Sequence, residues 1–275
     1  MTDASVIRGV ARRFGVRYLR RWGQNFLADR QQLARIVEAL ELAPQDHIVE
    51  VGPGLGALTV ELAGRARAVT GVEVDPACVK ALGLTLRNRS NVRIIEADIL
   101  RTAVGELLPS PYRVAGNIPY NLTGALFVHL LEQPQPPARI DLLVQREVAE
   151  RLVAPPGAWS LATLGVRIYG RPELTLRVPR SAFYPPPQVD SALVRIIPDP
   201  QPALPRADLP GFFDFVTPFF QARRKQLPFV LGRRRGVSGA EARDRLAVIG
   251  IDPARRAETL SLEEWRRLFE NERAN

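Results

Sequence analysis

Short apolar runs alternate with stretches of helical periodicity over the first half of the chain. Four of these runs predict buried strands: His47–Val51, Ala68–Val74, Val92–Ala97 and the run that ends at Asn117. Apolar residues at helical spacing predict a helix that begins after Asp29, a suitable N-cap. A helix over Thr123–Leu131 and a fifth strand over Ile140–Val144 follow. Such alternation is typical of a doubly wound parallel sheet with right-handed crossovers.

The second half of the chain has a different pattern. Leu174–Val178 and Ala192–Ile197 are apolar and have no helical pattern between them, so they predict an antiparallel pair at the sheet edge. A proline-rich linker comes next, with Pro198, Pro200, Pro202 and Pro205. Helical periodicity then returns over Phe212–Phe220, Ala240–Ile249 and Leu262–Phe269.

These patterns suggest three parts. Residues 1–22 carry six arginines and one acidic residue, and we interpret them as a basic, partly helical arm rather than a mitochondrial transit peptide. Residues 23–200 form the predicted sheet domain, and residues 206–275 a small helical domain beyond the linker. The predicted fold class is α/β, a Rossmann-like sheet with a small C-terminal helical domain.

Polar or turn residues stand at the ends of the predicted strands. The first strand runs into the turn Gly52–Gly56, and the others end at Glu73, Asp98 and Asn117. Because ligands of open parallel sheets bind at the carboxyl ends of the strands, we expect these residues to share one site. A carboxylate at Glu73 can accept both hydroxyls of a ribose, and Asp98 could accept from an adenine amine.

The glycine turn itself indicates which class of cofactor binds. It reads E-V-G-P-G-L-G, and both Pro53 and the preceding Glu50 disfavour a helix N-terminus dedicated to pyrophosphate. A tight glycine turn still lets the backbone approach a ligand closely. Glu50 has a second interpretation, in which it only satisfies backbone groups near the turn. The pattern fits a cofactor with adenine and ribose but no phosphate, and S-adenosylmethionine is the candidate.

The tetrapeptide Asn117-Ile118-Pro119-Tyr120 predicts a site for a planar substrate. Pro119 interrupts regular hydrogen bonding, so Asn117 is presented at a strand end with Tyr120 just beyond it. An amide beside an aromatic ring suits a base with an exocyclic amine, because the amide oxygen accepts from the amine and the ring stacks. The alternative is a purely structural loop.

Charge adds a partner class. The chain has 275 residues, a formal net charge of +9 and a pI near 10.6, which favours a polyanion such as nucleic acid over a membrane surface. The single Cys78 excludes an intrachain disulfide, and with only His47 and His129 besides it no metal site is expected. The run Arg223–Lys225, together with Arg233–Arg235, is interpreted as contacting RNA phosphates, with a solvated face as the alternative.

Eight segments carry a family resemblance: GQNFL (23–27), EVGPGLGALT (50–59), EVD (73–75), EADIL (96–100), GNIPYN (116–121), QREVAERL (145–152), SAFYPPPQVDSALVR (181–195) and FFQARRKQL (219–227). Together they resemble the KsgA-type rRNA adenine N6,N6-dimethyltransferases over nearly the whole chain. The resemblance implies contacts with S-adenosylmethionine from Asn25, Leu27, Gly52, Glu73, Asp98 and Asn117. It implies a pocket for the target adenine made by Asn117, Pro119, Tyr120 and Phe183.

The implied activity is dimethylation of adenosine N6 in small-subunit (16S-type) rRNA during ribosome biogenesis. The amide oxygen of Asn117 and a backbone carbonyl near Ile118 or Pro119 would hold the two N6 hydrogens, while Tyr120 and Phe183 stack on the base. Phe183 could instead be a core aromatic. The expected protein is a cytoplasmic, RNA-binding monomer without a metal or a membrane.

Two other functions remain open. One is a large-subunit adenine methylase of the macrolide-resistance type, which the FxPPPxVDS and FFQARRKQL segments disfavour. The other is a non-catalytic ribosome-assembly factor with the same fold, which the presence of Asn117, Tyr120, Glu73 and Asp98 disfavours.

Overall fold

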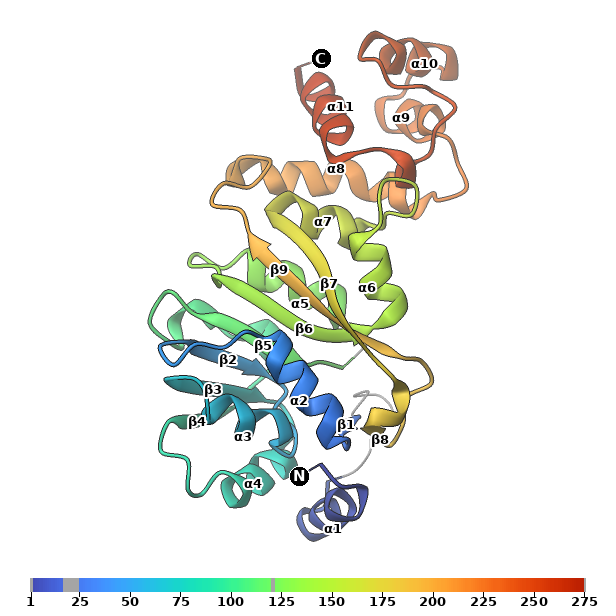
Figure 1. Ribbon diagram of the computed structural model, residues 1–275. Coiled ribbons are helices and arrows are strands. Elements are labelled where there is room, and N and C mark those ends of the chain that lie inside the picture. The colour runs from blue at the N-terminus through green and yellow to red at the C-terminus, as the bar shows by residue number, and fades with distance from the viewer. Residues whose placement is uncertain (1, 17–24, 120–121, 275) are drawn as a thin grey trace. The chain divides into compact units, whose positions relative to one another are not determined.

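The computed structural model describes residues 2–16, 25–119 and 122–274 (Figure 1). Its strands are β1 (Phe26–Leu27), β2 (His47–Val51), β3 (Ala68–Glu73), β4 (Val92–Glu96), β5 (Arg113–Asn117), β6 (Arg139–Gln145), β7 (Gly170–Val178), β8 (Phe183–Tyr184) and β9 (Ser191–Pro198). Its helices are α1 (Ala4–Phe14), α2 (Arg30–Ala39), α3 (Ala57–Ala63), α4 (Pro76–Thr85), α5 (Thr123–Leu131), α6 (Arg146–Val153), α7 (Leu161–Tyr169), α8 (Leu209–Gln221), α9 (Leu227–Arg235), α10 (Gly239–Val248) and α11 (Leu262–Ala274).

The described strands form a seven-stranded sheet in the order β4-β3-β2-β5-β6-β9-β7, with β1 and β8 as a separate antiparallel pair. The strands β2 to β6 run parallel, and β9 pairs antiparallel with β6. The chain moves outward from β2 through β3 to β4 and then returns to the other side of β2 with β5. The strand order therefore reverses between β2 and β5, which is where open α/β sheets bind ligands. The predicted Rossmann-like α/β fold is confirmed.

Local signals in the sequence explain where the helices begin. The Asp29 carboxylate caps α2 by accepting from the backbone N–H groups of Gln31 at 2.8 Å and Gln32 at 3.0 Å. Asp75 caps α4 in the same way, and Pro76 occupies the first turn of that helix, where its missing N–H is not needed. Both predicted starts are confirmed, and α5 has the predicted bounds.

The N-terminal segment packs more firmly than a simple basic arm. Residues Ala4–Phe14 form the amphipathic helix α1, capped by Asp3 and ended by Gly15 in the left-handed conformation. Ile7 and Ala11 are buried in one cluster with residues of α4, while the arginines of the helix face solvent. The segment is thus a docked helix whose polar face carries the positive charge. Residues 17–22 of the expected arm lie outside the described residues.

Two helices, α7 and α9, were not predicted from the sequence patterns. The α7 segment LATLGVRIY contains β-branched residues and Gly165, which weaken a helical pattern, yet a capping box between Ser160 and Thr163 starts a helix there. The α9 segment LPFVLGRRR is short and ends in arginines, so its periodicity is weak. Pro228 in its first turn is the signal that was available.

The chain divides into two compact units, Met1–Glu150 with Pro172–Pro198 and Arg151–Arg171 with Asp199–Asn275. The division differs from the sequence-based parts at one place, because α7 clusters with the helical unit through contacts with α8 and α11. The helical unit has an aromatic core, in which Phe219 contacts Trp265 edge-on at 5.3 Å. Within the described ranges, no helix is long and apolar enough to cross a membrane.

Candidate functional site

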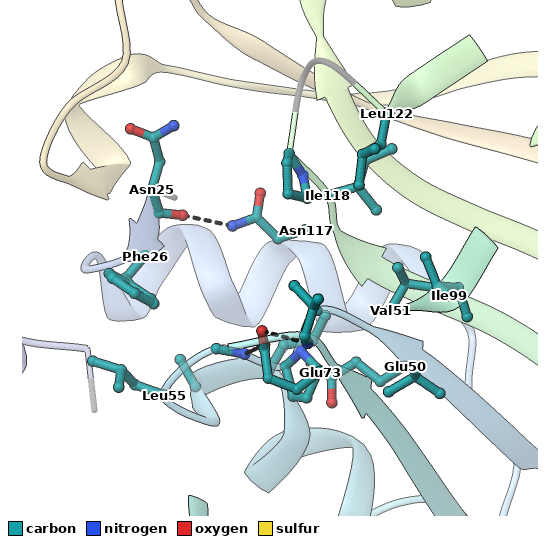
Figure 2. Close-up of a pocket in the computed structure, with 18 of the residues that line it drawn as sticks. Asn25, Phe26, Glu50, Val51, Leu55, Glu73, Ile99, Asn117, Ile118 and Leu122 are labelled. Carbon is teal, nitrogen blue, oxygen red and sulfur yellow. Dashed lines mark hydrogen bonds between the residues drawn. The ribbon is translucent and has the colours of Figure 1, made fainter. Parts of the chain in front are cut away.

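A cavity opens at the carboxyl ends of β2, β3 and β5, where the strand order reverses (Figure 2). Residues from segments far apart in the sequence line it: Ile7, Asn25–Leu27, Glu50–Leu55, Ala57, Leu58, Val72–Val74, Ala97–Ile99, Asn117–Pro119 and Leu122. The glycine turn, Glu73, Asp98 and Asn117 therefore share one site, as the sequence predicts. In the described part of the chain, no group of three His, Cys, Asp or Glu side chains is placed to hold a metal ion.

The glycine turn is built around the Glu73 carboxylate. Gly52, Gly54 and Gly56 have φ values of 64°, 59° and 88°, which side chains with a Cβ rarely adopt. Glu73 Oε2 accepts from the Gly54 N–H at 2.8 Å, and Oε1 accepts from the N–H groups of Val74 and Asp75 at 3.0 Å. Burial raises the pKa of Glu73, whereas these three donors act in the opposite direction by favouring the ionised form. The carboxylate thus joins the turn after β2 to the end of β3.

Asn117 presents an unoccupied acceptor to the cavity. Its Nδ2 donates to the backbone oxygen of Asn25 at 2.7 Å, which sets the orientation of the amide. Figure 2 shows Oδ1 directed away from Asn25, and no donor among the described residues contacts this oxygen. Asn25 itself precedes β1, which pairs with β8 through Leu27 and Phe183. The orientation of the Asn117 amide is therefore set by a contact with a residue 92 positions away in the sequence.

Glu50 forms a buried part of the cavity wall. Its side chain is 1% exposed, and Oε2 has no hydrogen-bond partner among the described residues. Burial raises the pKa of Glu50 to about 8, against a lowering by Thr59, and the nearby Glu73 raises it further. The sequence allowed the interpretation that Glu50 only satisfies backbone groups near the turn. Among the described residues, however, no backbone group donates to Oε2.

Apolar residues that sequence reasoning did not single out complete the cavity. Val74 and Ile99 each follow a strand-end carboxylate directly, and Leu122 begins the turn before α5. Val74 and Ile99 could have been predicted from the sequence, because each directly follows a strand-end carboxylate and a flat ligand held by those carboxylates needs apolar surfaces beside it. Ile7 could not be found this way, because the docking of α1 brings it to the cavity.

The predicted site residues are not all brought together. Asn25, Leu27, Gly52, Asp98 and Pro119 line the cavity. Phe183 is 3% exposed, belongs to the core cluster that includes Leu193, and does not line this cavity. Tyr120 lies outside the described residues.

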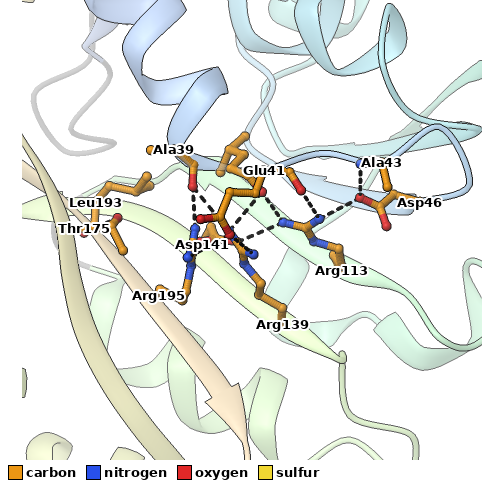
Figure 3. Close-up of polar contacts among 11 residues, drawn as sticks. Ala39, Glu41, Ala43, Asp46, Arg113, Arg139, Asp141, Thr175, Leu193 and Arg195 are labelled. Atoms are coloured by element: carbon orange, nitrogen blue, oxygen red, sulfur yellow. Dashed lines mark hydrogen bonds and ion pairs between the residues drawn. The ribbon is translucent and has the colours of Figure 1, made fainter.

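A second polar cluster lies at the other end of the parallel strands (Figure 3). Asp141, which is 1% exposed, accepts from Arg139 at 2.6 Å and Arg195 at 2.9 Å, and Arg113 lies 3.5 Å away. All three arginines also donate to the last carbonyl groups of α2, among them that of Leu40. Cations at a helix C-terminus satisfy its free carbonyls and oppose its dipole, so this cluster is structural.

Comparisons with known proteins agree with this geometry. The family model "Ribosomal RNA adenine dimethylase" matches residues 17–273. The chain is 43% identical to Ribosomal RNA small subunit methyltransferase A of Dehalococcoides mccartyi (strain CBDB1), over 90% of this chain and 85% of that protein. It is 40% identical to the protein of the same name from Pelotomaculum thermopropionicum, over 96% and 95%.

Two solved structures share the fold. The 23S rRNA methyltransferase ErmE is 34% identical with a TM-score of 0.69, covering 90% of this chain and 99% of that one. A dimethyladenosine transferase from Plasmodium falciparum has a TM-score of 0.72 at 23% identity, covering 88% and 95%.

The raised pKa of Glu50 predicts a pH dependence of stability. Its pKa rises from an ordinary value near 4.5 in the unfolded chain to about 8 in the folded one, so the folded state binds the extra proton between these values. Stability should therefore fall as pH rises from 5 to 8, by at most about 1.4 kcal/mol per pH unit. Glu50→Gln, which keeps the shape and cannot ionise, should flatten this fall in thermal unfolding. Parallel pH profiles for the two proteins would contradict the assignment.

The buried arginine cluster predicts a large loss of stability on removal of its carboxylate. Asp141→Asn removes the one fully buried anion that the three guanidinium groups share, and should lower the unfolding free energy by at most about 3–5 kcal/mol. The loss is limited because Arg113 keeps its pair with Asp46, and the other two arginines keep theirs with the exposed Glu41. Glu61→Gln is the matched control, because the exposed pair of Glu61 with Arg65 contributes no more than about 0.5 kcal/mol. Denaturant unfolding measures both, and equal effects would show that the cluster is not a structural centre.

Proposed function

The chain belongs to the ribosomal RNA adenine dimethylase family, and on that premise we propose that it dimethylates N6 of adenosines in small-subunit rRNA. S-adenosylmethionine is the proposed methyl donor, and ribosome biogenesis the proposed setting. The observation that carries the proposal is the Asn117 amide, whose nitrogen donates to Asn25 while no residue that the structure describes donates to its oxygen. An exocyclic amine is the group that such an acceptor selects.

The cavity suits a cofactor with adenine and ribose but no phosphate. Glu73 has three backbone donors on its two oxygens, which leaves acceptor capacity for a ribose hydroxyl. Asp98 is half exposed at the rim and would accept from the adenine amine, between the apolar surfaces of Val74 and Ile99. Asn25, Leu27 and Gly52 complete the proposed contacts. The cofactor supplies an electrophilic methyl group when bound.

The chain's contribution to methyl transfer is positioning. Adenine N6 is a poor nucleophile because its lone pair is delocalised into the ring, and two acceptors on its two hydrogens would turn the lone pair out of conjugation. Asn117 Oδ1 is one of these acceptors. The Pro119 carbonyl already accepts from the Leu122 N–H at 3.0 Å, so the Ile118 carbonyl is the proposed second acceptor. Correct orientation alone can contribute roughly 7–11 kcal/mol to such a reaction.

Stacking of the target base remains a proposal for two aromatic residues. Tyr120 would cover one face of an adenine that has left its helix, because the base must be unpaired to reach the cavity. For Phe183 the same role requires that its ring, now packed in the core, become accessible to the base. The expected monomeric state and cytoplasmic location also stay predictions.

The choice of ribosomal subunit separates this proposal from its main rival. Relatives named as small-subunit methyltransferases match at 43% and 40% identity, and the structure of a 23S rRNA methyltransferase matches at 34%. The FxPPPxVDS and FFQARRKQL segments favour the small subunit. Local chemistry at Asn117 is the same for both targets, so only the substrate itself can decide.

The deciding experiment is transfer of labelled methyl from S-adenosylmethionine to unmethylated small subunits, with large subunits and protein-free RNA in parallel. We expect N6,N6-dimethyladenosine in small subunits alone, because the proposed target is their rRNA. Label in large-subunit RNA would replace the proposal by the resistance-type activity. Tight binding to small subunits without any transfer would leave an assembly factor.

The role of Asn117 predicts a selective loss of activity. Asn117→Ala removes the acceptor for N6 and should reduce methyl transfer by at least two orders of magnitude, while binding to small subunits stays within a few-fold of the unmodified chain. Cofactor binding measured by calorimetry shows whether the cavity survives the change. Turnover close to that of the unmodified chain would exclude the N6-positioning role.

A further inference from the structure

A basic pocket with an exposed aromatic ring lies in the helical unit, outside the site described above. Its lining comes from the turn before α9, from α9 and α10, and from the segment after α10: Arg224, Lys225, Gln226, Pro228, Phe229, Gly239, Arg243 and Arg256. These residues are up to 32 positions apart in sequence, and the packing of α9 against α10 brings them together.

Within the described part of the chain, the four cations of this pocket have no carboxylate partner. None of Arg224, Lys225, Arg243 or Arg256 forms an ion pair with any residue that the structure describes. Neighbouring arginines behave differently. Arg234 pairs with an aspartate at 2.7 Å, Arg235 with a glutamate at 2.5 Å, and Arg245 with Glu241 at 2.9 Å. The unit thus neutralises many of its arginines and leaves those of the pocket available for an external anion.

Two of these cations lie beside a helix N-terminus, where a positive charge is unfavourable. Arg224 and Lys225 directly precede the N-terminus of α9, and Gly239 is the first residue of α10. Helix N-termini carry partial positive charge, so cations there are unfavourable for the helix unless an anion is bound beside them. A phosphate in the pocket would be attracted by the side chains and by both helix ends.

Phe229 adds a surface that phosphate alone does not need. Its side chain is 51% exposed, and it is the one exposed aromatic residue in the described part of the chain. The Lys225 ammonium lies 4.9 Å from the ring centroid. The other phenylalanines of the helical unit, such as Phe212 and Phe219, pack in its core. An exposed ring among unpaired cations matches the sites that bind single-stranded RNA, where bases stack on aromatic faces and cations hold the backbone.

We propose that this pocket binds one unpaired nucleotide of the RNA substrate, with its base stacked on Phe229 and its phosphate held by Arg224, Arg243 and Arg256. The inference rests on the proposed function for the identity of the RNA, and extends it by a second contact point that is not part of the methyl-transfer cavity. It also divides the basic runs: the pocket cations bind RNA, whereas Arg234 and Arg235 serve the packing of the helical unit.

The test measures binding of the full chain to a fluorescent single-stranded oligoribonucleotide, without cofactor, over a series of salt concentrations. Phe229→Leu should weaken binding about 5- to 100-fold through lost stacking and leave the salt dependence unchanged. Arg243→Gln should weaken binding and lower the slope of log affinity against log salt by about one. Arg245→Gln is the matched control on the same helix and should change neither quantity, since its charge is already paired. Phe229→Tyr should bind like the unmodified chain.

Several outcomes would overturn the inference. They are an unmodified chain that does not bind the oligonucleotide, a Phe229→Leu variant with full affinity, and equal effects of Arg243→Gln and Arg245→Gln. A simple anion site would give a different pair of results. Inorganic phosphate would then abolish the effect of Arg243→Gln on affinity, and Phe229→Leu would not change the affinity. Methyl transfer by the same preparations keeps the two proposals apart. Intact transfer with no effect of Phe229→Leu excludes only the pocket, and absent transfer with Phe229-dependent binding excludes only the proposed function.

Discussion

The Glu73 carboxylate is the interaction on which the cavity depends. In the glycine turn after β2, the Gly52 N–H still donates to the Val72 carbonyl of β3, whereas the Gly54 N–H donates to the Glu73 side chain at the end of that strand. The same side chain accepts from Val74 and Asp75, just before α4 begins. One buried carboxyl group therefore fixes the turn, the end of β3 and the start of α4 relative to one another. A ligand that binds Glu73 meets a carboxylate whose position is already set.

A second constraint fixes the N-terminal segment of the site along β5. The first residue of this strand, Arg113, donates to the Leu40 carbonyl at the end of α2, and the last one, Asn117, donates to Asn25 just before β1. The segment from Asn25 to Leu40 is thus attached to both ends of one strand. We expect that loss of the arginine cluster would also change the position of Asn25, although the cluster and Asn25 lie at opposite ends of β5. This link gives the buried cluster around Asp141 a part in shaping the site.

Most of the fold could be predicted because local signals and periodicity agree. Asp29, Pro76 and the apolar runs of β2 to β6 each indicate the same element as the tertiary structure contains. Residues at strand ends were predictable as a site because parallel strands bring their ends together. Ile7 and the free oxygen of Glu50 were not, since both depend on packing between distant segments. The burial of Phe183 likewise follows from the pairing of β1 with β8, and no local sequence pattern predicts this pairing.

Charge shows most clearly why sequence alone could not locate the RNA-binding groups. The formal charge of +9 indicates a polyanionic partner, but a run of arginines has the same sequence pattern whether its members bind RNA or carboxylates of their own chain. Arg235 forms an ion pair with Glu272, whose side chain is 2% exposed, whereas Arg243 has no carboxylate partner among the residues that the structure describes. An anion within about 4 Å of an arginine repels a phosphate and so weakens the attraction of that arginine for it. The arginines that have no carboxylate partner among the described residues are therefore the ones we propose for RNA binding, and in the helical unit several of them lie around Phe229.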